Sequence, residues 1–207
     1  MIVVIDYGTG NLHSVVNAMR VLGASVKISQ SPNIIDKAKK LILPGVGHFG
    51  EAVRKLRKMK IFYLIKKKIE RGVPFLGICV GMQLLFESSA EDLSVSGLGL
   101  IKGKVKKFAS ANLIVPHMGW NQITLNKNRS GENSRKLFKG IKCGSFFYFA
   151  HSYYCSPFNK DLIVSFTDYG GKFASAVNKD NIWAVQFHPE KSQVLGLDIF
   201  RNFIYSC

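Results

Sequence analysis

Acidic residues are scarce in this sequence. It has 13 Asp and Glu against 29 Lys and Arg in 207 residues, a formal net charge of +16. That excess is compatible with nucleic-acid binding, with an anionic ligand, with an acidic partner, or with a basic face that contacts only water. Hydrophobic residues make up 47% of the chain, so it is neither disordered nor fibrous, and it is long enough to bury a full core.

Membrane and metal-binding signals are also missing. No apolar run approaches the ~20 residues of a transmembrane helix, and Asp6 follows the first apolar run too closely for a signal peptide. The cysteines fit neither a zinc pattern nor a CxxC pair; they are Cys79, Cys143, Cys155 and Cys207. We therefore expect a reduced, cytoplasmic protein with no metal site and no membrane association.

The first half of the chain alternates predicted strands and helices. Apolar runs predict strands at 2–5, 25–29, 41–43 and 75–78. Helical spacing of apolar residues predicts helices at 12–22, 50–58, 61–71 and 82–86. Such alternation favours a parallel sheet with helices on both faces.

After Gly97 the pattern changes to short β-rich segments. We expect strands within 99–108, 121–125, 146–150, 162–167, 172–178 and 182–187, and a helix near 195–204. Loops are expected at 110–112 and 126–134. Because no linker rich in Pro, Gly or Ser separates the halves, we predict one α/β domain with a β-rich second half.

A cysteine stands at the junction between a predicted strand and a predicted helix, in the segment Gly77-Ile78-Cys79-Val80-Gly81. This pattern is typical of a nucleophile elbow, a sharp turn that exposes the reactive side chain at the carboxyl edge of a sheet. The flanking glycines let neighbouring backbone approach closely. Taken alone, the segment also fits a buried and inert cysteine.

A cysteine nucleophile needs a base, and the base needs a group that orients it. The strand predicted at 182–187 ends in His188-Pro189-Glu190. His188 can take the thiol proton, and Glu190 can accept a hydrogen bond from the other ring nitrogen. The sequence therefore indicates a candidate triad of Cys79, His188 and Glu190, although a His-Pro-Glu segment alone is also an ordinary turn.

Acyl chemistry also needs donors for the developing oxyanion. The glycine-rich segment Pro44–Gly47 follows the strand at 41–43, where its backbone N–H groups can serve as donors. Taken alone, this segment fits an ordinary tight turn after a strand better. The N–H of Val80, directly after the cysteine, is the second candidate.

Together these segments resemble the class I glutamine amidotransferases. Segments 6–11, 116–121, 147–153 and 186–191 narrow the similarity to the glutaminase subunits of imidazole glycerol phosphate synthases. The similarity covers essentially the whole chain. It implies a single glutamine amidotransferase type 1 domain over 1–207, with a flavodoxin-like α/β fold whose central, mostly parallel sheet is flanked by helices.

The resemblance also implies the chemistry. Cys79 attacks the side-chain amide of L-glutamine, ammonia leaves a glutamyl thioester, and water releases glutamate, with His188 as base and then acid and Glu190 orienting it. No cofactor is implied. The implied oxyanion and substrate-binding residues are Gly45, Gly47, Val80, Gln83, Glu91, Ser152 and Tyr153. Val80 often corresponds to Leu in the family, but only its N–H is invoked.

The implied partner is a (β/α)₈ cyclase subunit, bound as a heterodimer. It receives the ammonia and makes imidazole glycerol phosphate and aminoimidazole carboxamide ribotide in L-histidine biosynthesis. The residues implied to face it are Asn11, Trp120, Tyr148 and Lys191.

Three alternatives remain. Paralogous subunits supply ammonia for surface-sugar amidation and carry nearly the same motifs. A γ-glutamyl hydrolase or another cysteine hydrolase of this fold would need no partner. A nucleic-acid-binding module would suit the net charge, but the basic residues of Arg54–Arg71 alternate with apolar ones, which is typical of solvated helix faces, and no nucleic-acid-reading motif is present.

Overall fold

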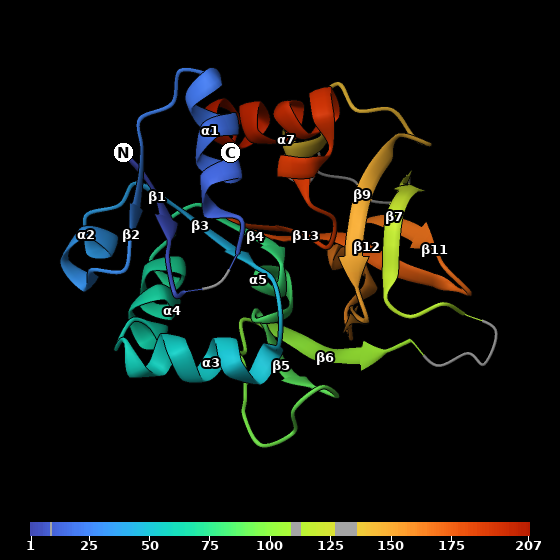
Figure 1. Cartoon of the computed structure of the whole chain (residues 1–207), viewed down its shortest axis with the longest axis horizontal. Helices are drawn as coiled ribbons and strands as arrows, with labels where there is room; N and C mark the ends of the chain where they lie inside the picture. The colour runs from blue at the N-terminus through green and yellow to red at the C-terminus, as the bar shows by residue number, and fades with distance from the viewer. Residues whose placement is uncertain (9, 109–112, 127–135) are drawn as a thin grey trace.

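An eight-stranded sheet forms the centre of the protein in the computed structural model, which describes residues 1–8, 10–108, 113–126 and 136–207 (Figure 1). Its strand order is β2-β1-β3-β4-β13-β12-β11-β8. The parallel strands are β1 (Ile2–Ile5), β2 (Val26–Ser29), β3 (Lys40–Gly45), β4 (Phe75–Cys79) and β13 (Ile182–Val185). The antiparallel extension consists of β12 (Lys172–Lys179), β11 (Ile163–Asp168) and β8 (Thr124–Leu125).

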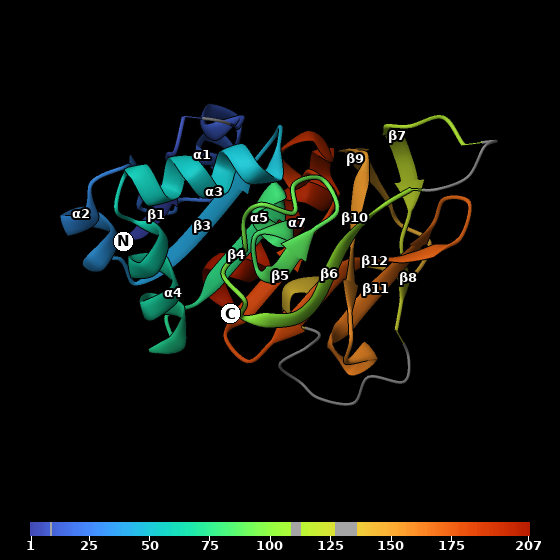
Figure 2. The ribbon, with the colours of Figure 1, turned by 90° about the horizontal axis from the view of Figure 1, so that it is seen from below.

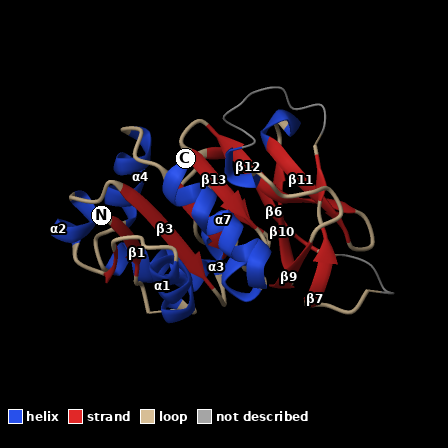
Figure 3. Cartoon of the chain, turned by 90° about the horizontal axis from the view of Figure 1, so that it is seen from above, coloured by secondary structure: helices blue, strands red, loops and turns tan. Residues whose placement is uncertain are grey.

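Helices cover both faces of this sheet. Figure 3 shows α1 (Leu12–Val21) and α7 (Gln193–Tyr205) on one face, and Figure 2 shows α3 (Phe49–Lys58) and α4 (Phe62–Glu70) on the other. The shorter helices are α2 (Pro32–Asp36) and α5 (Val80–Gln83), with 3-10 turns η1 (Lys136–Phe138), η2 (Lys160–Leu162) and η3 (Pro189–Lys191). All residues of β1, β4 and β13 are buried, as continuous apolar strands under two helical layers should be.

Two smaller β units, built mostly from the second half of the chain, accompany the central sheet. A three-stranded sheet has the order β10 (Tyr153–Pro157), β6 (Ile101–Lys107) and β5 (Phe86–Ser89). An antiparallel ribbon pairs β7 (His117–Gln122) with β9 (Phe146–His151). The expected α/β architecture with a β-rich second half is therefore confirmed.

The basic segment Arg54–Arg71 forms the outer surfaces of α3 and α4. These helices bury apolar side chains such as Leu56 and Ile65, while Arg57 and Lys67 are exposed. The charge therefore follows the amphipathic pattern expected from the sequence. Within the described ranges, no helix has the length and apolar character needed to span a membrane.

The prediction of a helix at 82–86 is wrong. The helical turn α5 ends at Gln83, and Phe86 begins β5. The carbonyls of Leu84 and Leu85 accept hydrogen bonds from the distant Leu98 and Leu100, at 2.7 and 2.9 Å, so they cannot serve a continuing helix.

Other boundaries also differ from the prediction. The strand predicted at 182–187 ends at Val185, and the one at 121–125 is divided between β7 and β8. The elements α2, β5 and β10 were not predicted. The expected loop at 110–112, and all of the expected loop at 126–134 except Asn126, lie outside the described residues.

Candidate active site

Cys79 is the last residue of β4 and has φ +54° and ψ −108°, a conformation that residues other than glycine rarely adopt. The turn around it is very tight. A Cβ atom added to Gly81 would lie 1.8 Å from the carbonyl oxygen of Leu43, and one added to Gly77 would lie 2.7 Å from that of Gly81. The two glycines are therefore required for the backbone to pass through the elbow.

The sheet topology places the three candidate segments at one edge. Strand β4 lies between β3 and β13 and runs parallel to both. Gly45, at the end of β3, pairs with Cys79, and His188 follows shortly after β13. The thiol, the glycine-rich loop and the base thus meet at the carboxyl ends of adjacent parallel strands, where open α/β sheets bind ligands.

His188 and Glu190 form a buried pair. Nδ1 of His188 lies 2.8 Å from Oε1 of Glu190, and both side chains are 2% exposed. Since a carboxylate only accepts, Nδ1 of His188 donates the hydrogen bond. Nε2 is therefore the ring nitrogen that is available for proton transfer. Within the described part of the chain, Nε2 makes no hydrogen bond of ordinary geometry; catalytic hydrogen bonds are often long before substrate binds.

Electrostatics favour a protonated His188. Burial lowers the pKa of its imidazole, but the charge and hydrogen bonding of Cys79, followed by those of Glu190, outweigh burial and raise this pKa to about 10. Positive charge on this ring is thus stabilised beside Cys79. The thiolate is the nucleophilic form of cysteine, and a cationic ring beside the sulfur is an arrangement that suits a cysteine nucleophile.

Two groups that the sequence did not assign to the site contact the thiol of Cys79. Nε2 of Gln186 donates to Sγ at 3.6 Å, and Sγ lies 3.9 Å from the carbonyl oxygen of Ala150. Gln186 is fully buried. A polar residue in the buried run just before His188 is a signal that could have marked Gln186 as unusual, although it does not say what the side chain contacts.

The expected oxyanion residues lie beside the elbow. A Cβ atom on Gly45 would be 2.9 Å from Cβ of Val80 and 3.3 Å from N of Gly81. Gly47 has φ +95° in the turn that leads from β3 into α3. Gly45 and Val80 are therefore in direct proximity, while Gly47 shapes the loop beyond them.

Three of the expected substrate-binding residues come together. Nε2 of Gln83 donates to the carbonyl oxygen of Tyr153 at 3.0 Å. Burial, with a contribution from the Glu91 charge, raises the pKa of the Tyr153 phenol. Glu91 also accepts from the N–H of Phe49 at 2.6 Å, at the start of α3. Ser152 precedes Tyr153, and its carbonyl accepts from Phe108.

The expected partner-facing residues group on the outer face of the β7–β9 ribbon. Trp120 and Tyr148 are paired in register, with their rings edge to face at 6.2 Å. Nζ of Lys191 lies 5.3 Å from the centre of the Tyr148 ring. The carbonyl of Tyr148 accepts from N of His188 at 2.8 Å, so this face is bonded to the candidate base. Asn11 is exposed at the start of α1, which packs against η3.

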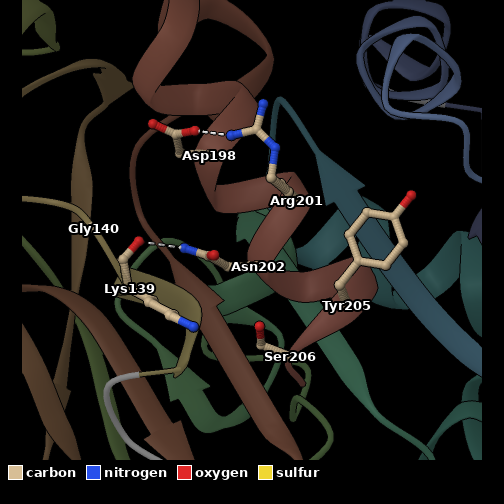
Figure 4. Close-up of a pocket in the computed structure, with 7 residues that line it drawn as sticks. All are labelled: Lys139, Gly140, Asp198, Arg201, Asn202, Tyr205 and Ser206. Atoms are coloured by element: carbon tan, nitrogen blue, oxygen red, sulfur yellow. Dashed lines mark hydrogen bonds and ion pairs between the residues drawn. The ribbon is translucent and has the colours of Figure 1, made fainter.

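A separate hollow of about 410 Å³ lies between α7 and the segment after η1 (Figure 4). Asp198 and Arg201 form an ion pair on its wall, and Nδ2 of Asn202 donates to the carbonyl of Lys139 at 2.9 Å. It contains none of the expected site residues.

Comparisons with known proteins agree with this geometry. The family model for class I glutamine amidotransferases matches residues 3–207. The chain belongs to this family. It is 46% identical over 99% of its length to the imidazole glycerol phosphate synthase subunit HisH of Methanocaldococcus jannaschii, covering 98% of that protein. It is 44% identical to the subunit of the same name from Aquifex aeolicus, covering 97% of this chain and 94% of that one.

A solved glutamine amidotransferase structure has the same fold. Its TM-score is 0.74 at 18% identity, covering 97% of this chain and 96% of that one. The resemblance found in the sequence, to the family and to its imidazole glycerol phosphate synthase subunits, is therefore confirmed.

Proposed function

We propose that this protein is the glutamine amidotransferase subunit of an imidazole glycerol phosphate synthase in L-histidine biosynthesis. It hydrolyses L-glutamine to glutamate and ammonia. The observation that carries the proposal is the meeting of Cys79, in its strained turn, with the buried His188–Glu190 pair at the carboxyl ends of β4 and β13. Sequence identity of 44–46% over nearly the full length to subunits of that name supports the specific reaction.

The geometry supports a thioester mechanism. The Cys79 thiolate attacks the amide carbon of glutamine, and backbone N–H groups near Gly45 and Val80 stabilise the oxyanion. Protonated His188 gives its proton to the leaving nitrogen, so ammonia departs and a glutamyl thioester remains. His188 then takes a proton from water, whose oxygen attacks the thioester and releases glutamate and the thiolate. Glu190 keeps Nδ1 protonated throughout.

The substrate wall is proposed from the residues around this centre. Gln83, Glu91 and Tyr153 lie together beyond the nucleophile, with Ser152 next to them. Gly47 belongs to the same proposal as part of the oxyanion loop. The full chain is proposed to act as one domain, 1–207.

The acceptor chemistry is proposed to lie on a (β/α)₈ cyclase subunit that forms a heterodimer with this chain. It uses the ammonia to make imidazole glycerol phosphate and aminoimidazole carboxamide ribotide. We propose the ribbon face as its docking site, with Asn11, Trp120, Tyr148 and Lys191 in contact. A reducing cytoplasmic location belongs to the same proposal, and the need of the nucleophile for a free thiol supports it.

The decisive experiment mixes the chain with the cyclase subunit from the same source. Glutamate release and glutamine-dependent formation of imidazole glycerol phosphate are both measured. We expect strong stimulation of glutamate release by the partner. Full turnover by the isolated chain would instead indicate a partner-independent hydrolase, and stimulation only by a sugar-amidating partner would indicate the paralogous role.

A further inference from the structure

A pair of histidines is buried beside the active site but outside the proposed triad. His117 on β7 and His151 on β9 are opposite each other in the ribbon register and are 3% and 5% exposed. Aromatic rings surround them: the ring of His117 stacks on Tyr169 at 4.0 Å, and that of His151 lies 5.3 Å from Phe173. A polar pair in such an apolar cluster is favourable only if its hydrogen bonds are satisfied.

The hydrogen bonds of this pair fix the proton on each ring. Nδ1 of His151 lies 2.8 Å from the carbonyl oxygen of Tyr153, which only accepts, so Nδ1 donates. In the neutral ring Nε2 must then accept, and Nδ1 of His117, at 3.1 Å, donates to it. Nε2 of His117 in turn accepts from Nδ2 of Asn121 at 3.2 Å.

The start of this chain of bonds is also determined. Nδ2 of Asn121 donates to the carbonyl of Asp168 at 2.9 Å, while its Oδ1 accepts from N of Gln122 at 2.7 Å. These two bonds settle which amide atom is nitrogen. Every donor from Asn121 to His151 therefore points the same way, toward the active site.

Both rings stay neutral in this environment. Burial lowers the pKa of His117 to about 4. Burial also lowers the pKa of His151 to about 3, and the nearby charges of His117 and His188 act in the same direction. The positive charge of protonated His188 thus reinforces the neutral state of His151, and burial alone favours that state when His188 gives up its proton, so the direction of the bonds persists through the reaction.

The chain of bonds ends on the substrate wall. The Tyr153 carbonyl that accepts from His151 also accepts from Nε2 of Gln83 at 3.0 Å. The same Nε2 lies 3.4 Å from Oε1 of Gln186, whose own Nε2 donates to Sγ of Cys79. One carbonyl thus connects the histidine pair to the residues that line the nucleophile.

We propose that His117 and His151 are positioning residues for glutamine binding, acting through a one-way hydrogen-bond relay that runs from Asn121 to the Tyr153 carbonyl and fixes the amide of Gln83. The role rests on the proposed glutaminase function. The relay reaches the substrate wall and does not touch the reacting atoms. Its loss should therefore weaken glutamine binding more than it slows the chemical steps.

The test compares three variants of the full chain. His151→Phe keeps a ring but removes the donor, His151→Asn keeps an N–H near the position of Nδ1, and Tyr169→Phe removes a hydroxyl that bonds Ile114 in the same cluster but lies outside the relay. Glutamine affinity is measured calorimetrically in a Cys79→Ala background, and KM and kcat are measured in the complex with the cyclase subunit.

We expect His151→Phe to weaken glutamine binding and raise KM about 5- to 10-fold, as loss of one buried hydrogen bond should, with kcat changed less than about twofold. His151→Asn should recover most of the affinity, and Tyr169→Phe should keep it. Unchanged affinity in His151→Phe, or equal losses in all three variants, would overturn the proposal. Absence of glutamate release by the wild type would instead refute the proposed function.

A spectroscopic measurement on the wild-type protein tests the relay even if a variant does not fold. Nitrogen-15 shifts of the wild-type imidazoles near neutral pH should show neutral rings protonated at Nδ1 for both His117 and His151. A ring protonated at Nε2, or a charged ring, at either position would overturn the proposal.

Discussion

Nδ1 of His188 donates to Oε1 of Glu190 across 2.8 Å, with both side chains almost fully removed from solvent. The two residues are separated only by Pro189, which begins η3. The carboxylate therefore holds the ring at a fixed angle and stabilises its positive charge in a region of low dielectric constant.

Replacing Glu190 should reduce the activity of His188 while leaving the imidazole in place. Glu190→Gln keeps the size of the side chain but removes its charge, so we expect glutamate release to fall by about 10³-fold. The pKa of His188 should also fall from its value of about 10, because one of the groups that raise it is lost. Partner-stimulated glutamate release and NMR titration of His188 test both effects. Glu51→Gln, on the exposed face of α3, is the control and should behave as wild type.

Cys79→Ala should abolish glutaminase activity while leaving the fold and partner binding intact. The thiol is the proposed nucleophile, and no other described side chain is placed at the end of β4 to replace it. Glutamate release and co-elution with the cyclase subunit are the measurements. Release at the wild-type rate would eliminate Cys79 as the nucleophile.

Lys191→Ala should reduce stimulation by the partner more than it reduces stability. The cation lies over the Tyr148 ring, whose backbone is bonded to His188 and Ser192. Loss of a cation–π contact of about 0.5–1 kcal/mol should lower stimulation about 2- to 5-fold. Lys191→Arg should retain most of it. Lys67→Ala, on the exposed side of α4, is the control; an equal loss there would contradict a specific role.

The buried histidines should make the fold sensitive to mild acid. Their folded-state pKa values, about 4 for His117 and about 3 for His151, lie below the usual 6.5. Below pH 6.5 the unfolded chain therefore binds protons that the folded chain does not, and stability falls as pH decreases. Between pH 6.5 and its folded-state pKa, each histidine should reduce the folding equilibrium constant by up to about tenfold for each unit by which the pH falls.

Denaturant unfolding at pH 7 and pH 5 measures this effect. His151→Phe should show a smaller loss between the two pH values than the wild type. An identical loss in both proteins would show that His151 does not titrate as proposed.

Gly81→Ala should destabilise the protein through the backbone of the elbow. The added Cβ would meet the Leu43 carbonyl at 1.8 Å. Relief requires a displacement of β3 or of α5, so we expect a loss of about 3 kcal/mol. Gly50→Ala is the comparison: its Cβ would meet the carboxylate of Asp92 and, at 2.9 Å, the Cβ of the same residue. The carboxylate can rotate away and give up its ion pair with Arg54, and a small shift of the segment around Asp92 relieves the rest, so we expect a smaller loss. A similar loss at both positions would contradict this view of the elbow.

The sequence predicted the elements that have simple periodic patterns. The apolar runs that became β1, β3 and β4 and the amphipathic segments that became α3 and α4 were read correctly, since one physical period determines each. Leu84-Leu85-Phe86 was misread because a short apolar run fits a helix and a strand equally well. Backbone hydrogen bonds from the distant Leu98 and Leu100 prevent a helix here. The local sequence gives no sign of such bonds.

The arrangement of the candidate site was predictable only where it depends on simple strand patterns. Cys79, His188 and Glu190 each follow a recognisable strand, and parallel pairing alone brings them together. The thiol contact of Gln186 and the His117–His151 pair depend on the register of β13 and of the β7–β9 ribbon. Register is set by packing across the whole sheet, so no spacing in the sequence could reveal these contacts.

The place of β13 between β4 and β12 has a consequence for protein synthesis. Cys79 leaves the ribosome early, but Gln186, its contact on the far side, is 107 positions further along the chain, and the base comes later still. Until those residues emerge and β13 inserts beside β4, the nascent chain carries the thiol without the means to use it. In the proposed mechanism, ammonia release can therefore begin only once Gln186 and His188 have been synthesised and β13 has inserted, when the proposed docking surface formed by β9 and η3 is also present.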